Sequence, residues 1–269
     1  MAIAEAGFVE IGGQRLEYRF AGPQPDVAPT LVLLHEGLGC VGLWNDFPEN
    51  LAAATGIGVF VYSRAGYGKS SPVSLPRPLT YMHDEARQTL PKLLDAIGFR
   101  RGLLIGHSDG ASIAAIYAGS YQDHRVGGVV LIAPHFFIEE SNLAAIAEAT
   151  KAYKTGDLRA RLARWHDDVD NAFQGWNEAW LDPQFRKWDI MEFLAYIRVP
   201  VLIVQGENDQ YGTVKQIEVA QEECYCPVEV ALLPKARHSP QRDVPEPTLK
   251  VISDFVARTL RANKWVKAA

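Results

Sequence analysis

The chain has few cysteines and no excess of positive charge, and each shortage excludes a class of protein. Its three cysteines, Cys40, Cys224 and Cys226, are too few for a disulfide framework, and no second ligand pair at zinc-finger spacing accompanies the last two. We therefore expect reduced thiols. Lysine and arginine together number 27 against 32 aspartates and glutamates, a net charge of −5. The chain thus carries no basic footprint for nucleic acid or anionic lipid.

Long apolar runs are also missing, because no stretch approaches the roughly 18 apolar residues of a membrane span. Residues 1–10 have no basic segment of the signal-peptide kind. We accordingly predict a cytoplasmic protein that binds neither membrane nor nucleic acid. His166 with Asp167 and Asp168 is interpreted as a solvated helix face, so no metal site is predicted. The oligomeric state is left open.

What the chain does have is an alternation of short β-like runs with helix-prone runs, which is typical of a mostly parallel sheet flanked by helices. A chain of 269 residues can bury a full core of this α/β class. The expected strands are residues 8–13, 15–21, 30–35, 58–63, 101–106, 126–133, 199–205 and 228–233. The expected helices are residues 43–54, 81–97, 111–118 and 246–262.

The alternation stops between Pro134 and Arg198, where the pattern is helical and rich in tryptophan and phenylalanine. We predict an α/β core over residues 1–134 and 199–269, with residues 135–198 inserted as a helical cap. A small helical unit on an α/β sheet favours an apolar ligand pocket beneath it. Trp176 and Trp180 are the aromatic residues that we expect to line that pocket.

Gly106-His107-Ser108-Asp109-Gly110 lies where an apolar run ends and a helix-prone run begins, so it predicts a strand, a sharp turn and a helix. A serine at the apex of such a turn presents its hydroxyl to a substrate. The flanking glycines lack the Cβ atoms that would block the turn. The N–H of Asp109, unpaired at the start of the new helix, is expected to face a negative charge forming beside Ser108.

A serine nucleophile needs a base within reach and a carboxylate to orient that base. Asp209 follows an expected strand, and His238 lies between the last strand and the last helix, so both are predicted at the edge where open α/β sheets place their sites. The order Ser, Asp, His is that of a nucleophile-elbow hydrolase. Two alternatives stay open: Asp209 as a helix cap and His238 as a solvated loop residue. Substitute acids are Glu207 and Asp243.

The oxyanion formed by attack of Ser108 needs two preorganised donors. One is the N–H of Asp109, and the other is expected from the loop His35-Glu36-Gly37-Leu38-Gly39. Gly37 is the first choice for this donor, because a glycine lets the backbone approach a substrate closely, and Leu38 is the second.

Of the remaining histidines, His35 and His107 are expected to support the site's backbone, whereas the others, His83, His124, His135 and His166, have no matching strand-end context.

Taken together, these motifs resemble the α/β-hydrolase superfamily, in particular its cap-bearing carboxylesterase-like members. The resemblance runs from about Phe8 to the last helix and rests on five ordered elements, namely the His35 loop, the turn at residues 63–70, residues 106–110, residues 206–209 and His238. Members usually have glycine directly after the loop histidine, where this chain has Glu36. If that position required a positive φ, glutamate would be strained by roughly 1 kcal/mol or more, so we expect a shifted loop path.

We predict a serine hydrolase that cleaves a small-molecule carboxylic ester through an acyl-enzyme, without cofactor or metal. Glu36 is expected to project toward the pocket and disfavour anionic substrates, with Leu38, Trp176 and Trp180 as further contacts. Amide or peptide hydrolysis, carbon–carbon bond hydrolysis and perhydrolysis use the same three residues and stay open. An aminopeptidase would need acidic residues such as Glu139 and Glu140 to hold the substrate's amine. A small-molecule receptor on the same fold is the alternative of another class.

Overall fold

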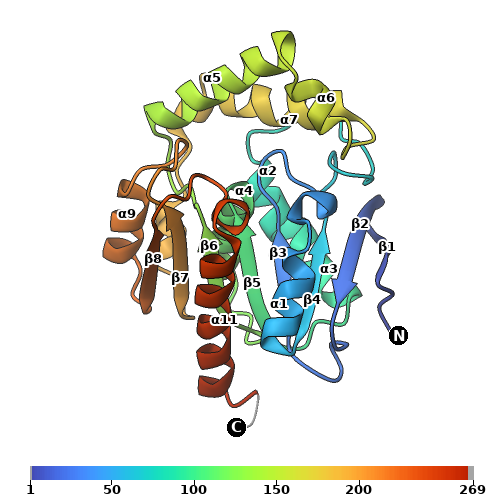
Figure 1. Ribbon diagram of the computed structural model, residues 1–269, viewed down its shortest axis with the longest axis vertical. Helices are drawn as coiled ribbons and strands as arrows, with labels where there is room; N and C mark the ends of the chain where they lie inside the picture. The colour runs from blue at the N-terminus through green and yellow to red at the C-terminus, as the bar shows by residue number, and fades with distance from the viewer. Residues whose placement is uncertain (1, 266–269) are drawn as a thin grey trace.

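The computed structural model describes residues 2–265. In that part of the chain eight strands form one sheet in the order β1-β2-β4-β3-β5-β6-β7-β8 (Figure 1). β1 and β2 are antiparallel to their neighbours, whereas all other neighbours pair in parallel. The strands are β1 (Ala6–Ile11), β2 (Gln14–Ala21), β3 (Thr30–Leu34), β4 (Gly58–Tyr62), β5 (Gly102–His107), β6 (Val126–Ile132), β7 (Val201–Gly206) and β8 (Val228–Leu233). The predicted α/β fold with a mostly parallel sheet is confirmed.

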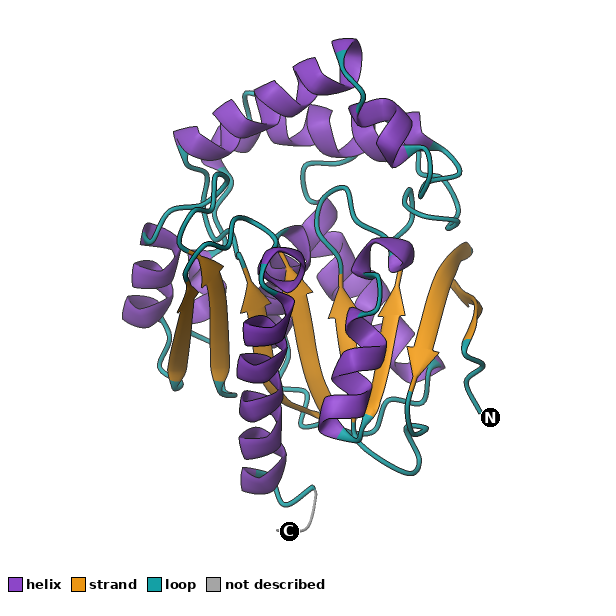
Figure 2. Cartoon of the chain, viewed as in Figure 1, coloured by secondary structure: helices purple, strands orange, loops and turns teal. Residues whose placement is uncertain are grey.

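Helices cover both faces of the sheet (Figure 2). In Figure 1, α1 (Phe47–Thr55) and α11 (Pro245–Ala262) lie on the near face, while α3 (Leu90–Ala96) and α4 (Asp109–Ser120) lie behind it. α2 (Tyr81–Asp84) and α9 (Lys215–Glu223) also contribute to the core on the α4 face. Because the sheet is covered on both sides, its central strands can be apolar throughout.

β3 illustrates why these strands form here. All five of its residues are buried, and its side chains alternate between the two helical layers. Leu31 and Leu33 pack in the core shared with α1 and α11, whereas Val32 and Leu34 pack in the core shared with α4. A continuous apolar run is therefore what a doubly covered strand requires.

Two of the expected helices are interrupted. Residues 43–54 do not form one helix: a 3₁₀ turn at Val41–Trp44 ends at Asn45, whose φ is 48°, and α1 begins only at Phe47. The expected helix over residues 81–97 contains a π-helical segment at Glu85–Thr89 between α2 and α3. Pro91, which cannot donate a backbone hydrogen bond, stands just after that segment. α9 and the short α10 (Pro240–Asp243) were not expected.

The segment between β6 and β7 is helical, as predicted. It contains α5 (Glu140–Thr155), α6 (Leu158–Leu162), α7 (Val169–Leu181), a 3₁₀ turn (Phe185–Lys187) and α8 (Met191–Leu194). Figure 1 shows α5, α6 and α7 beyond the carboxyl ends of the parallel strands. α8 lies elsewhere, because the backbone of Phe193 packs directly on Gly119 of α4. The last part of the segment thus packs on the sheet's own helical layer.

Candidate active site

Ser108 occupies the sharp turn between β5 and α4. Its backbone has φ 54° and ψ −118°, a conformation that L residues adopt only under strain. The turn leaves no room for side chains beside it, since a Cβ on Gly106 would lie 2.1 Å from the carbonyl oxygen of Gly110. A Cβ on Gly110 would lie 2.1 Å from the carbonyl oxygen of Leu34. Both glycines of the motif are therefore required by close approach.

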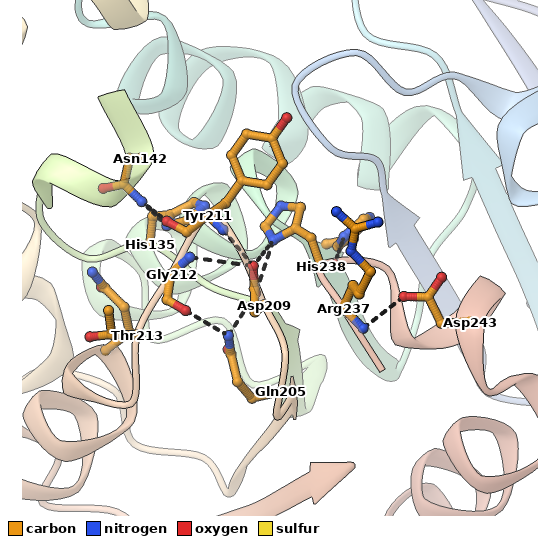
Figure 3. A network of polar contacts seen from close by, with 12 residues as sticks. His135, Asn142, Gln205, Asp209, Tyr211, Gly212, Thr213, Arg237, His238 and Asp243 are labelled. Carbon is orange, nitrogen blue, oxygen red and sulfur yellow. Dashed lines mark hydrogen bonds and ion pairs between the residues drawn. The ribbon is translucent and has the colours of Figure 1, made fainter. Parts of the chain in front are cut away.

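Asp209 and His238 meet at the carboxyl edge of the sheet, as predicted from their strand-end positions. His238 Nδ1 lies 2.9 Å from Oδ1 and 3.0 Å from Oδ2 of Asp209 (Figure 3). The carboxylate accepts from Nδ1–H, which leaves Nε2 of His238 as the unprotonated nitrogen of the neutral ring. The helix-cap alternative for Asp209 does not hold in this structure, because the next helix, α9, begins only at Lys215 and has Val214 as its N-cap.

Further polar groups fix the Asp209 carboxylate. Gln205 Nε2 donates to Oδ2 at 2.6 Å, and the N–H of Tyr211 donates to Oδ1 at 2.8 Å. Burial by itself would raise the pKa of this carboxyl group, but the hydrogen bond and charge of His238, together with the Tyr211 N–H, lower the pKa below its usual value. Asp209 is accordingly ionised near neutral pH and orients the imidazole.

Ser108 and His238 line one cavity of about 180 Å³ that lies below α5 and α7. The other lining residues are Glu36, Gly37, Leu38, Asp109, His135, Asn142, Ile146, Trp176, Trp180, Gln210, Tyr211 and Ser239. Among the described residues, neither Ser108 Oγ nor His238 Nε2 has a hydrogen-bond partner. Such contacts are commonly loose in unliganded enzymes and tighten when substrate binds.

His107, the residue before Ser108, connects the turn to the histidine loop. Its Nε2 donates to the carbonyl oxygen of His238 at 2.8 Å, and its Nδ1 lies 3.1 Å from the side-chain amide of Gln241. The predicted backbone-supporting role of His107 thus agrees with its contacts, which tie the loop of residue 238 to the end of β5.

The loop after β3 is held by a buried guanidinium. Arg64 donates to the carbonyl oxygens of His35 and Glu36, and the Glu36 carbonyl also accepts from His35 Nδ1 at 2.7 Å. Because a trans peptide directs its N–H opposite to its C=O, these bonds turn the N–H of Gly37 away from Arg64. Among the described residues that N–H has no partner, and Gly37 lines the cavity. These contacts favour Gly37 as the second oxyanion donor.

Gly37 is also the point where α7 contacts this loop. A Cβ at residue 37 would lie only 2.1 Å from Nε1 of Trp176, so no larger residue fits without displacing the Trp176 indole. Glu36, by contrast, is not among the non-glycine residues with positive φ. The condition under which Glu36 would be strained, a positive φ, is therefore not met, and the loop follows a path that glutamate can adopt.

The Glu36 side chain lines the cavity, and its carboxylate is directed at His107 and Arg242. Its carboxylate lies 3.4 Å from His107 Nδ1 and 3.9 Å from Arg242. Burial by itself would raise the pKa of Glu36, but the hydrogen bond and charge of His107 bring the pKa far below its usual range.

A second carboxyl group, that of Asp109, is fully buried and accepts a 2.5 Å hydrogen bond from Tyr81. Burial raises the pKa of Asp109.

The cavity-lining predictions for Leu38, Trp176 and Trp180 agree with the structure, whereas the acidic pair proposed to hold an amine does not line the cavity. Glu139 is the N-cap of α5, and its carboxylate accepts from Thr213 and Gln216. Glu140 is solvent-exposed and pairs with Arg186 at 2.8 Å. Neither carboxylate is available to bind a substrate's ammonium group.

Two histidines were interpreted wrongly from the sequence. His166 is 4% exposed rather than solvated, and it bridges two loops by accepting from the N–H of Gly68 and donating to the carbonyl of Leu38. His135 does have a strand-end context, because it follows β6 by three residues and lines the cavity. The signal that could have found it is a histidine just beyond a strand's carboxyl end.

No group of three or more histidine, cysteine, aspartate or glutamate side chains within residues 2–265 is placed to hold a metal ion. Within the same residues, no helix has both the length and the apolar character needed to cross a membrane. Cys40, Cys224 and Cys226 are free thiols.

Known proteins resemble this chain over most of its length. The 3-oxoadipate enol-lactonase 1 of Acinetobacter baylyi is 26% identical over 261 residues, covering 91% of this chain and 94% of the lactonase. A proline iminopeptidase of Lactobacillus helveticus is 29% identical over 235 residues, covering 73% and 79% of the two chains.

The crystal structure of the enol-lactonase from Burkholderia xenovorans LB400 matches with a TM-score of 0.72 at 20% identity, covering 93% of this chain and all of that one. The sequence pattern of the alpha/beta hydrolase family matches residues 31–251. This span contains all of β3 but its first residue, the strands β4 to β8, the Ser108 turn, Asp209 and His238. Fold, strand order and sequence match agree, and the chain belongs to the alpha/beta hydrolase family.

Proposed function

We propose that this hydrolase cleaves a neutral carboxylic ester or lactone, with Ser108 as nucleophile, His238 as general base and acid, and Asp209 as the group that orients His238. The single observation that carries the proposal is the strained Ser108 turn opening into the same cavity as a histidine whose other nitrogen is held by a buried carboxylate. This arrangement is the one that activates a serine hydroxyl.

In the proposed reaction, Ser108 Oγ attacks the acyl carbon while its proton passes to His238 Nε2. The oxyanion is held by the N–H groups of Asp109 and Gly37, each of which contributes about 10²–10³ in rate in comparable sites. His238 then protonates the leaving alcohol oxygen. Water, deprotonated by the same nitrogen, hydrolyses the acyl-enzyme and regenerates Ser108.

The charge distribution of the cavity supports a neutral substrate. No lysine or arginine is among its lining residues, while Glu36 and Asp209 both carry low carboxyl pKa values and hence negative charge at neutral pH. A substrate carboxylate placed there would lose its hydration without gaining a cationic partner. We therefore expect uncharged acyl and alcohol groups, in contact with Leu38, Ile146, Trp176 and Trp180.

Ester or lactone cleavage is favoured over aminopeptidase activity for a specific reason. A peptide substrate with a free amine needs a carboxylate to bind its ammonium group. Glu139 and Glu140 do not line the cavity, and the carboxylate of Glu36, which does, already interacts with His107 and Arg242. The resemblance to an enol-lactonase adds weight to the oxygen-ester class, while the resemblance to a proline iminopeptidase keeps an amide substrate as the second candidate.

We also propose that α5, α6 and α7 act as a cap that excludes water from the site.

The proposal is tested by hydrolysis of p-nitrophenyl acyl esters of increasing chain length, with fluorophosphonate labelling followed by peptide mapping. Labelling on Ser108, loss of turnover in proportion to labelling, and a preference among neutral acyl chains are expected. If labelling falls on another residue, or if turnover persists in the fully labelled protein, the proposal is wrong. A ligand that binds tightly and is recovered unchanged would instead indicate a receptor on this fold.

A further inference from the structure

His135 is a second histidine in the cavity, and nothing in the proposed reaction uses it. It is 2% exposed, and its ring stacks on that of His238 with centroids 5.5 Å apart and planes 24° apart (Figure 3). Its other face contacts Trp180 edge-on at 5.4 Å between centroids. Whatever group the His135 ring binds therefore lies next to the bond that His238 helps to break.

The tautomer of His135 is set by Asn142 of α5. Asn142 Oδ1 accepts from the N–H of Glu139 at 2.6 Å, while Asn142 Nδ2 donates to the carbonyl oxygen of Tyr211 (Figure 3). These two backbone partners fix which end of the amide is oxygen and which is nitrogen. The amide nitrogen lies 3.4 Å from His135 Nδ1, so Nδ1 is the acceptor and the ring proton resides on Nε2.

The His135 ring is neutral when it carries that single proton. Burial, followed by the nearby charge of His238, lowers the pKa of His135 to about 3. The Nδ1 edge faces Gly212, where an added Cβ would lie 3.4 Å from Cε1 and 3.6 Å from Nδ1. The opposite edge carries Nε2–H, which has no acceptor among the described residues while the ring lines the cavity. An unpaired donor in such a place is costly unless a ligand satisfies it.

We propose that His135 Nε2–H donates a hydrogen bond to an uncharged oxygen of the substrate, in addition to the scissile ester, so that the preferred substrates are neutral esters or lactones bearing a second oxygen acceptor. This inference rests on the function proposed above. The second oxygen is a ketone, ether or ester oxygen about two to five bonds from the scissile carbonyl carbon, because single bonds near 1.5 Å have to bridge neighbouring rings. A hydroxyl group serves as acceptor in the same way.

The test compares two substrates that differ only at that oxygen. One series consists of p-nitrophenyl alkanoates, and the other has a single chain methylene replaced by an ether oxygen or a ketone, moved one position at a time. For the wild-type protein we expect one position at which the oxygenated ester has the higher kcat/KM, by roughly three- to tenfold, as for a neutral hydrogen bond. His135→Phe is expected to abolish that ratio.

The measured quantity is the ratio between paired substrates, so any loss common to both cancels. Ile146→Ala is the matched control, because it alters the same cavity without removing a donor, and its substrate ratio should match that of the wild type. His135→Gln, which retains an N–H donor, should restore part of the preference. If His135→Phe fails to fold, as judged by circular dichroism, Asn142→Leu, which removes the group that sets the His135 tautomer, should lower the same ratio.

Three outcomes are distinguishable. A position-dependent oxygen preference that His135→Phe removes supports the inference. Turnover of both series with equal ratios in wild type and His135→Phe overturns the inference and leaves the serine-hydrolase proposal standing. No turnover of either series, with no fluorophosphonate label on Ser108, overturns the proposed function itself and the inference with it.

Discussion

The carboxyl edge of the sheet and the helices that lie over it are built on different physical grounds. At the edge, Ser108, Asp209 and the 35–39 loop are positioned by backbone geometry and by buried polar bonds from groups such as Arg64 and Gln205. Over it, α5 and α7 contribute side chains, chiefly Trp176, Trp180 and Ile146, that meet the cavity through apolar surface. The first region can specify a reaction, and the second can specify which molecule undergoes it.

This difference teaches which changes will be severe. A hydrogen-bonded site loses activity when one geometry is lost, because donors and acceptors act only over a narrow range of distance and angle. An apolar wall tolerates substitution in proportion to volume and area. The contact between Gly37 and Trp176 is where the two regions meet, so it is where a substitution in one should be felt in the other.

The largest effect is expected at the edge. Ser108→Ala should lower kcat for a neutral ester by roughly 10⁴ or more, since the attacking oxygen is removed while the fold is retained. Steady-state hydrolysis with purified protein measures this loss. Ser253→Ala on α11 is the matched control, far from the cavity, and should retain wild-type kcat. Activity of Ser108→Ala within tenfold of wild type would show that the edge does not carry the reaction as described.

The next effect is expected where the regions meet. Gly37→Ala should lower kcat by about 10²–10³, because the added Cβ displaces either the oxyanion donor or α7. Combining it with Trp176→Leu, which removes the indole that the Cβ would strike, should recover part of the loss. A Gly37→Ala protein with normal kcat, or a double variant no better than the single one, would show that this contact does not connect the two regions.

A smaller effect is expected from substrate charge. p-Nitrophenyl butyrate and the half-ester p-nitrophenyl succinate differ chiefly by one carboxylate, and we expect at least tenfold higher kcat/KM for the neutral ester, because the cavity lining has no cation. The comparison is made at pH 7 with salt varied from low to high. Equal rates, or a preference for the anion, would show that the charge of the cavity does not select the substrate.

The smallest expected effect concerns Asp109, whose role in the reaction is through its backbone N–H. Because burial raises its carboxyl pKa in the folded state, the folded protein binds that proton more tightly than the unfolded chain does. The contribution of this one group to stability is then largest at low pH and is lost as pH rises through the raised folded pKa. Asp109→Asn lacks this titration. Its free energy of unfolding should therefore increase relative to that of the wild type as pH rises, while kcat changes little.

Urea unfolding of both proteins at a series of pH values from 4 to 8 measures that difference. If the free energy of unfolding of Asp109→Asn minus that of the wild type falls or stays constant as pH rises, the assignment is contradicted. A kcat loss in Asp109→Asn comparable to that of Ser108→Ala would also contradict it, because the carboxyl group would then take part in the reaction.

Much of the edge was predictable from sequence because it depends on local signals. Continuous apolar runs such as residues 30–34 predicted the buried strands, and glycines around Ser108 predicted the turn. Asp209 and His238 followed from the rule that strand ends converge on one edge. Errors arose where one residue broke a pattern locally, as Asn45 did within the expected helix over residues 43–54.

Long-range polar contacts were not predictable. Nothing in the sequence around Arg64 shows that its guanidinium holds the carbonyls of a loop 28 residues away. Asn142, which fixes the tautomer of His135, lies in a helix whose placement over the sheet depends on packing rather than pattern. The function of Glu139 as a helix cap was likewise hidden, since a carboxylate in a helical segment has many possible partners.

The most direct test of the central claim is mass spectrometry of the protein quenched within milliseconds of mixing with a slowly hydrolysed neutral p-nitrophenyl ester. The account predicts a burst of p-nitrophenol together with a peptide containing Ser108 whose mass is increased by one acyl group, and a decay of that species at the rate of turnover. Turnover without any acylated Ser108, or acylation of a different residue that decays at the turnover rate, would contradict it.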